Sequence, residues 1–249
     1  MKHIITTLLL LLISVAADAQ KAEIDGIYYN LSPKTKTAEV TSSPKHYSGE
    51  LTIPGIIAYD GVKYRVTGIG TKAFVSNFGL TSVHLPEGLA TIGESAFAYC
   101  RIDSIIVPNS IDSIGDFAFA YCPNLRKAVL GKNLTTLGNG VFVSCENLVD
   151  AVVPDRVVSL GVGVFNQCKK LLSATLGQRV ETIGAQCFAN CVSLRYFYSY
   201  ADLVPKAHET AFEHVKISKV MLFVPMFSVK QYEKREPWGY FKSVKPMKE

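Results

Sequence analysis

Phenylalanine recurs along the chain at an almost constant interval, and two other residue types keep a fixed distance from it. A glycine stands four residues before each phenylalanine, and a cysteine stands three residues after all but the first. A period of 22 to 23 residues kept in register over six copies predicts a solenoid of stacked coils. The three columns are Phe74, Phe97, Phe119, Phe142, Phe165 and Phe188; Gly70, Gly93, Gly115, Gly138, Gly161 and Gly184; and Asn77, Cys100, Cys122, Cys145, Cys168 and Cys191.

Each copy also contains a short alternating segment that predicts a β-strand. In the first copy it runs from Leu80 to Pro86, and equivalent segments cover residues 102–108, 125–131, 148–154 and 171–177. Apolar residues at positions 1, 4 and 6 point inward, and a proline or glycine ends the strand. The phenylalanine and cysteine, three residues apart, predict a short helical turn on the opposite side of the coil.

The first nineteen residues have the pattern of a secretory signal peptide. Lys2 precedes an apolar run over residues 4–15, and Ala17-Asp18-Ala19 fits a small-residue cleavage site. The run is shorter than the roughly 20 residues of a membrane span, although a retained N-terminal anchor is the alternative. No cysteine follows the run, so a lipoprotein anchor is not expected. The sequence therefore predicts an exported protein, secreted, at the cell surface or periplasmic, with no membrane span after cleavage.

Dissimilar caps are expected at the two ends of the repeats. Ile57 and Tyr59, the Asp60-Gly61 pair and the residues after it predict a hairpin with a two-residue turn. A degenerate seventh copy contains Phe212 and ends near residue 215, followed by an expected strand over 221–224 and an expected helix over 228–235. The predicted organisation is a signal peptide over 1–19, an N-terminal β cap over 20–67, repeats over 68–215 and a C-terminal cap over 216–249.

The repeat pattern resembles that of BspA-like leucine-rich repeat proteins of bacterial surfaces. Segments 80–100 and 102–122 match L-x-x-I-x-L-P-x-x-L-x-x-I-G-x-x-A-F-x-x-C most closely, and both flanks are similar too. The resemblance implies an α/β repeat solenoid: a right-handed leucine-rich-repeat coil with a parallel sheet on one face and short helical turns on the other. It also implies adhesion to, or binding of, host or extracellular proteins.

The cysteines have three interpretations. Six cysteines in an exported protein are compatible with disulfides or a metal site. Five of them occupy one core column, however, where a cysteine behaves as a small hydrophobic residue, and we favour this structural role. Neighbouring coils would still bring two cysteines within disulfide reach. Cys187 lies outside the column and is the residue expected to be most reactive. No metal and no cofactor are expected.

The remaining polar residues give no catalytic pattern. His208-Glu209 and Glu213-His214 lack the spacing of a zinc-binding helix and are expected to be structural or exposed. No nucleophile elbow or phosphate-binding loop occurs, so we do not expect an enzyme. The net charge of +5 comes mostly from the segment after Cys191, which argues against a nucleic-acid-binding stripe along the repeats.

The outward strand positions supply the candidate binding face. Positions 2, 3 and 5 of each strand face outward, and several carry apolar or aromatic side chains. The predicted ligand-binding residues are Ile106, Val129, Val149, Val152, Leu172, Thr175, Tyr196 and Tyr198. Two simpler explanations remain: β-branched residues favour strands anyway, and the tyrosines could lie under the cap. An extracellular or host protein is the expected partner, with a glycan-binding module or a structural envelope protein as the alternatives.

Overall fold

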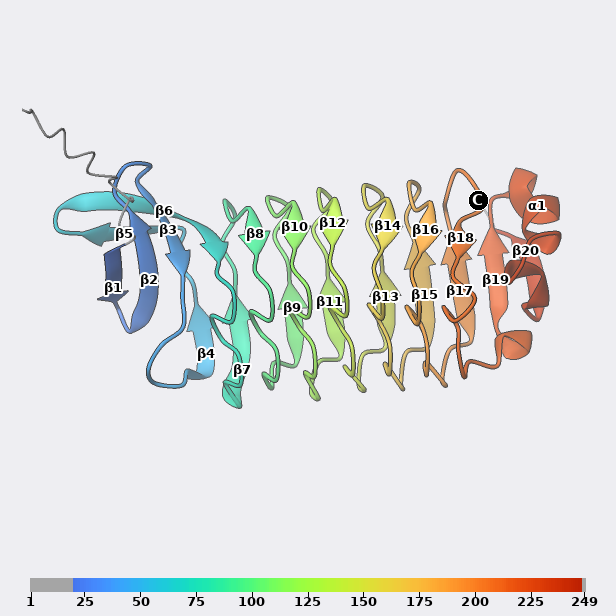
Figure 1. The fold of residues 1–249 in the computed structure, drawn as a ribbon, viewed down its shortest axis with the longest axis horizontal. Helices are drawn as coiled ribbons and strands as arrows, with labels where there is room; N and C mark the ends of the chain where they lie inside the picture. Colours follow the sequence, from blue (N-terminus) through green and yellow to red (C-terminus); the bar gives the residue numbers. More distant parts are fainter. Residues whose placement is uncertain (1–19, 248–249) are drawn as a thin grey trace, which may run out of the picture.

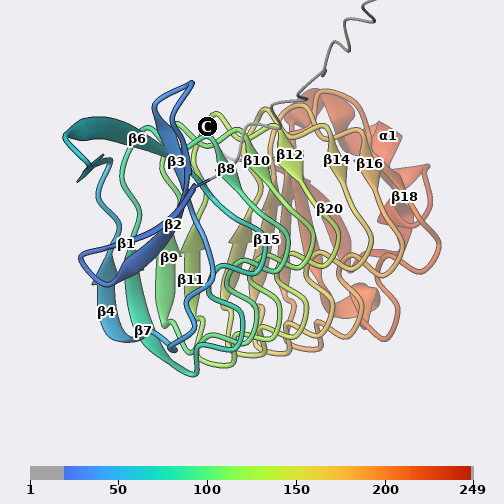
Figure 2. The ribbon, with the colours of Figure 1, turned by 60° about the vertical axis from the view of Figure 1, so that its left-hand side comes forward.

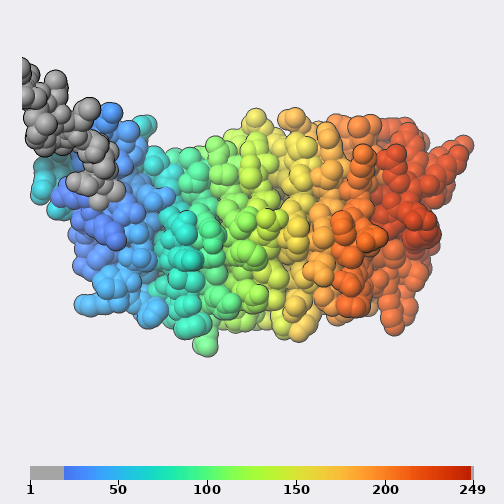
Figure 3. Space-filling view, viewed as in Figure 1, coloured from blue at the N-terminus to red at the C-terminus, as the bar shows by residue number. Residues whose placement is uncertain are grey.

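A computed structural model describes residues 20–247 of the 249-residue chain. The predicted signal peptide, residues 1–19, lies outside this range. The chain winds into an elongated solenoid whose coils lie side by side along the long axis (Figure 1). In the space-filling view each stretch of sequence occupies one slice of the molecule, so neighbouring slices are successive coils (Figure 3).

Two rows of parallel strands run along the solenoid (Figures 1 and 2). The register pairs equivalent residues of successive coils, such as Ile106 with Val129 in the first row and Ile114 with Leu137 in the second. Sequence analysis anticipated only the first row. The first row comprises β7 (Gly79–His84), β9 (Ser104–Ile106), β11 (Lys127–Val129), β13 (Asp150–Val152), β15 (Ser173–Leu176) and β17 (Tyr196–Ser199). The second row comprises β8 (Thr91–Ile92), β10 (Ser113–Ile114), β12 (Thr136–Leu137), β14 (Ser159–Leu160), β16 (Thr182–Ile183) and β18 (Lys206–Ala207).

The segments around the column phenylalanines are tandem turns rather than regular helix, so the predicted short helical turns are confirmed only in part. In the coil of Phe142, the backbone N–H of Val143 donates to the Gly140 carbonyl at 3.0 Å, whereas that of Phe142 donates to Val164 in the next coil at 2.8 Å. Gly140 and Ser144 have φ values of 56° and 57°, outside the helical region. An α-helix would use its amides within its own segment. Alternating turns instead free every second amide to bond the neighbouring coil.

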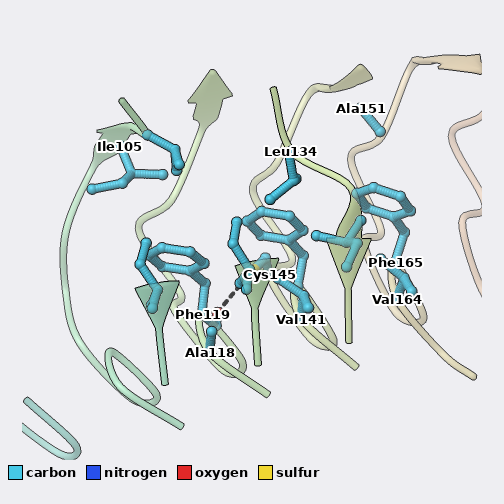
Figure 4. Packing of buried hydrophobic residues seen from close by; sticks show 14 of the residues in the cluster. Ile105, Ala118, Phe119, Leu134, Val141, Cys145, Ala151, Val164 and Phe165 are labelled. Atoms are coloured by element: carbon cyan, nitrogen blue, oxygen red, sulfur yellow. Dashed lines mark hydrogen bonds between the residues drawn. The ribbon is translucent and has the colours of Figure 1, made fainter. Parts of the chain in front are cut away.

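The column phenylalanines form a continuous stack through the core. Successive ring centroids from Phe74 to Phe188 are 4.9–5.6 Å apart and nearly parallel, and Phe212 extends the stack by one ring at 5.5 Å. Figure 4 shows the rings of Phe119 and Phe165 among the buried aliphatic side chains. Six of the seven rings are at most 1% exposed, and Phe212 is 7% exposed. The stack is therefore the core of every coil.

The column glycines are explained by close approach of successive coils. A Cβ atom on Gly93 would lie 2.6 Å from the backbone nitrogen of Thr71, and one on Gly115 would lie 2.7 Å from that of Glu94. Both distances are too short for any side chain, and neither glycine has a positive φ. Glycine in a tight turn supplies either a positive φ or space for a close backbone approach, and here it supplies the space.

The N-terminal cap is a small sheet that continues into the second row. The predicted hairpin is confirmed: β5 (Ile56–Tyr59) pairs with β6 (Val62–Ile69) around Asp60 and Gly61, whose φ values are 47° and 75°. Positive φ at both turn residues is the type I′ requirement. The other cap strands are β1 (Gln20–Ile24), β2 (Ile27–Ser32) and β3 (Thr37–Val40), with β3 parallel to β6. β4 (Ser48–Thr52) pairs with β7 at the start of the first row.

The C-terminal cap extends the first row and then covers the last coil. β19 (Met221–Val224) coincides with the expected strand and pairs with β17, and β20 (Ser243–Pro246) pairs with β19. The expected helix is present but shorter, as α1 (Val229–Glu233). Single 3-10 turns occur at η1 (Ile217–Lys219), η2 (Met226–Ser228) and η3 (Trp238–Tyr240). The buried Trp238 packs against Phe197 and Phe212, with centroid distances of 5.6 and 5.8 Å, and so closes the phenylalanine stack.

Truncating a phenylalanine in the middle of the stack should be costly. Phe142→Ala removes a ring with a neighbour on each side, and we expect it to lower the free energy of unfolding by about 3–5 kcal/mol. Phe142→Leu, which keeps most of the volume, should cost about 1.5 kcal/mol or less. Urea unfolding followed by circular dichroism measures both. A loss below roughly 1 kcal/mol for Phe142→Ala would show that the column is not core.

Candidate binding face

The outward side of the first row carries a strip of exposed apolar residues. Ile106 is 70% exposed and Val152 is 55% exposed, although both lie in regular strands. Val129, Val149, Leu172 and Tyr196 are also exposed, whereas Thr175 and Tyr198 are half-buried. The structure thus brings all eight residues singled out from the sequence to one sheet face. Their role in binding stays a prediction.

Register aligns the position-5 residues of this strip in two runs, which are separated between Val129 and Val152; the second run forms a continuous line. Ile106 pairs with Val129, Val152 with Thr175, and Thr175 with Tyr198. The line continues onto the cap, because Tyr198 pairs with Phe223 and the two rings stack with centroids 4.9 Å apart. Phe223 was missed by sequence reasoning. Phe223 could have been found, because a strand was predicted over residues 221–224 and strand alternation places Phe223 on its outward side.

The first row is divided into three hydrogen-bonded segments, and a cavity lies at each of the two divisions. The segments are β4 with β7, β9 with β11, and β13 with β15, β17, β19 and β20. Between β11 and β13 the Val149 amide still donates to the Arg126 carbonyl at 3.2 Å. Beyond this bond a cavity of about 590 Å³ opens, lined by Val129, Val152 and their neighbours.

This opening exposes side chains that are core elsewhere. Ala128 and Leu130 are half-buried and line the cavity. Their equivalents in the next coil, Ala151 and Val153, are 3% and 2% exposed. An apolar side chain of a partner could therefore reach the edge of the core between β11 and β13. Sequence reasoning could not find this opening, because the inward positions of β11 carry the same apolar residue types as those of the other strands.

Charged residues stand on both sides of the same opening. Lys127 belongs to β11 and Arg126 directly precedes it, and both side chains are exposed. Asp150 lies across from them on β13 and accepts a hydrogen bond from the Ser173 hydroxyl at 2.6 Å. A smaller cavity of about 260 Å³ lies at the other division, between β7 and β9, and includes His84 and Ile106. The face therefore combines an apolar strip, two openings and charges of both signs.

The tyrosines at the C-terminal end lie beside the strip. Tyr196 is 40% exposed and Tyr200 is 48% exposed. Tyr198 is half-buried because its ring stacks on Phe223. The explanation in which the cap covers these tyrosines therefore does not hold for Tyr196 and Tyr200.

The cysteine column has a structural role that sequence analysis described incompletely. Each column thiol donates to the carbonyl of the phenylalanine in the preceding coil; for Cys145 the acceptor is Phe119, at 3.0 Å (Figure 4). The same contact is made by Cys100, Cys122, Cys168 and Cys191, at 3.0–3.2 Å. In the first copy Asn77 takes this position, and its side-chain oxygen instead accepts from the Tyr47 amide. All six cysteines are free and buried.

Cys187 is not the accessible thiol that its position outside the column suggested. It is 0% exposed, and burial raises its pKa well above the ordinary value. Cys187 directly precedes Phe188 and so belongs to a second inward column, shared with residues such as Ala118 and Val164. Burial likewise raises the pKa of Cys191, to about 12.

The two histidines near the seventh coil make separate contacts. His208 occupies the position of the column glycine, and its ring nitrogen Nδ1 lies 2.9 Å from the Thr210 hydroxyl. The Nδ1 atom of His214 lies 3.0 Å from the side-chain oxygen of Asn190. Across residues 20–247, His, Cys, Asp and Glu side chains form no group of three or more that could hold a metal ion.

Within the described range, none of the helices has the length and apolar character needed to cross a bilayer.

The fold and the face define a β-solenoid of the leucine-rich-repeat type. The family model for the BspA type leucine rich repeat region, in six copies, matches residues 67–195 and 158–233. The chain therefore belongs to the BspA-type leucine-rich repeat family. The resemblance found in the repeat sequence is thereby confirmed.

Solved structures of bacterial leucine-rich repeat proteins are similar to the chain. The T. pallidum leucine rich repeat protein is 26% identical, with 70% of this chain and 91% of that chain covered and a TM-score of 0.57. A protein from Bacteroides ovatus is 18% identical, with 90% and 76% covered and a TM-score of 0.47. One from Bacteroides capillosus is 26% identical, with 55% and 84% covered and a TM-score of 0.37. A search of curated protein sequences found no match.

The thiols should be unreactive until the solenoid unfolds. A thiol must ionise to react, and burial opposes ionisation. We expect the native protein to show no reaction with a disulfide reagent at about pH 8 within minutes, and the unfolded protein, prepared without reductant, to show all six thiols. Spectrophotometric titration measures both states. Fewer than six thiols after unfolding would mean disulfides, and a fast-reacting native thiol would contradict the burial of the columns.

Proposed function

We propose that this protein is an exported, non-catalytic binding module that captures an extracellular or host protein on the outward side of its first strand row. The observation that carries the proposal is the exposed apolar strip centred on the opening between β11 and β13, where Val129 and Val152 line a cavity of about 590 Å³. Contiguous exposed apolar surface on a solenoid sheet is typical of an interface.

The shape of the opening favours a protein partner. Protein interfaces concentrate their binding energy in a few large side chains that fill pockets near the centre. The opening offers such a pocket, with Ala128 and Leu130 at its base. Arg126 and Lys127 on one side and Asp150 on the other supply polar contacts around it, as in the rim of a typical interface.

Export rests on the sequence of the first nineteen residues, which has the charge, the apolar run and the cleavage pattern of a signal peptide. Secretion, display at the cell surface and release into the periplasm are all compatible with that pattern. Binding of a protein outside the cell is consistent with each of them.

Two charged substitutions in the opening test the proposal. Val129→Glu combined with Val152→Glu places carboxylates on exposed strand positions, so the fold should remain intact while the apolar contact is lost. Against an array of purified extracellular-matrix proteins, residues 20–249 should capture at least one, and the double variant should bind it more than about 10-fold more weakly. Surface plasmon resonance measures the affinities.

The matched control places the same charges on the second row. Thr91→Glu combined with Thr136→Glu changes two exposed strand residues on the other face and should leave capture unchanged. Equal binding by the wild type and the Val129/Val152 variant would exclude this face. Absence of binding to every matrix protein in the array would contradict the proposed class of partner.

A glycan is the second candidate ligand for this face, favoured by the exposure of Tyr196 and Tyr200. Aromatic rings supply broad apolar area with a polar group at one end, a combination suited to sugar rings. Tyr196→Ala should then weaken binding to neutral oligosaccharides on a glycan array without affecting protein capture. A structural role in the cell envelope would predict no binding in either assay.

A further inference from the structure

A second large cavity lies away from the apolar strip, at the C-terminal end of the second row. It has a volume of about 630 Å³ and lies between strand β18 and the segment that contains α1. Pockets of 300–1,000 Å³ are the usual size for small ligands. Neither the repeat pattern nor the proposed protein interface accounts for it.

Three cations surround this cavity. Lys206 belongs to β18, while Lys234 and Arg235 directly follow α1, so residues far apart in sequence converge on one site. Glu181 is the carboxylate in the lining. Within residues 20–247 the ion pair found is Lys169–Glu146, so neither lysine of the cavity has a carboxylate within 4.0 Å. A group of unneutralised cations around a cavity attracts an anion.

The wall that carries Lys234 and Arg235 is fixed to the solenoid by three hydrogen bonds. Arg235 Nη1 donates to the Val204 carbonyl at 3.0 Å, and the indole N–H of Trp238 donates to the Pro205 carbonyl at 2.9 Å. The hydroxyls of Tyr232 and Ser199 lie 2.7 Å apart in the buried interior. The cavity is therefore held in shape before any ligand arrives, which lowers the entropic cost of binding.

The rest of the lining combines hydrogen-bonding groups with one apolar side chain. Gln231 offers an amide, and the Thr182 hydroxyl, which donates to Ser159 at 2.7 Å, keeps its lone pairs for a donor. Leu203 is 69% exposed beside them. An acidic sugar presents a carboxylate or sulfate, several hydroxyls and an apolar C–H face, and each group has a counterpart here. A bare inorganic anion would use only the cations.

We propose that this cavity, which we call the cationic pocket, binds an acidic saccharide, with Lys206, Lys234 and Arg235 holding the anionic group. Gln231 and Thr182 bind sugar hydroxyls, and Leu203 contacts the C–H face of the ring. The carboxylate Glu181, whose backbone carbonyl accepts from the Lys206 amide at 2.8 Å, offsets one of the three positive charges and leaves two in excess, which still favours an anionic ligand.

Calorimetric titration of the protein spanning residues 20–249 with defined tetrasaccharides tests this assignment. The probes are a hyaluronan tetrasaccharide, which carries carboxylates, a chondroitin sulfate tetrasaccharide, which adds sulfates, and the neutral chitotetraose. At least one acidic probe should bind, and chitotetraose should not. Lys206→Ala with Lys234→Ala should weaken that binding roughly 10-fold or more, because each charged hydrogen bond contributes substantially. Arg235 is left in place since it also anchors the cap.

Matched variants separate a pocket from general attraction to a basic surface. Lys219→Ala with Lys242→Ala removes two exposed lysines from the same end of the molecule but outside the pocket. These changes should leave the affinity within about 2-fold of the wild type. Three results would overturn the proposal: no binding of either acidic probe, equal losses in both double variants, or inorganic sulfate competing as strongly as the tetrasaccharides.

The pocket is independent of the protein-binding face. Val129→Glu with Val152→Glu alters the first row and should leave saccharide affinity unchanged, whereas the Lys206/Lys234 variant should leave capture of a matrix protein unchanged. The two proposals therefore succeed or fail separately.

Discussion

The contact between one coil and the next is the constraint on which the rest of the structure depends. Each coil places its phenylalanine ring against the ring of its neighbour, and each column cysteine donates to the carbonyl of the phenylalanine one coil earlier. The column glycines allow the backbones to approach closely enough for both contacts. Because these contacts lie inside the solenoid, the repeat signature describes architecture, and both proposed binding sites lie on surface residues that differ from copy to copy.

The repeat was readable in sequence because its contacts use the same residue types at fixed spacing in nearly every copy. The phenylalanine, glycine and cysteine columns predicted stacked coils, the alternating segments predicted the strands of the first row, and the Asp60-Gly61 pair predicted its hairpin correctly. The helical turns were predicted only partly correctly, because a three-residue spacing also suits tandem turns. In these turns every second amide donates to a carbonyl of the next coil, as Phe142 does to Val164. Such a bond between coils leaves no periodic signal within a single copy.

The candidate sites were only partly readable for a different reason. Strand alternation was enough to bring Ile106, Val129 and Val152 to one face, because side-chain direction in a strand follows from position alone. The opening between β11 and β13 depends on how far two strands separate, which no residue type encodes locally. The cationic pocket joins Lys206 to Lys234 across the cap, so its members are recognisable only once the chain has folded.

The thiol–carbonyl contact offers the most direct test that the repeat columns are structural. An S–H group that donates to a carbonyl vibrates at a lower frequency than a free thiol, so infrared spectroscopy of the native protein reports the contact itself. With Cys187→Ala removing the thiol outside the column, the account predicts a lowered S–H band from the remaining five cysteines that moves to higher frequency on unfolding. A native band at the free-thiol frequency, or no S–H band at all, would contradict it.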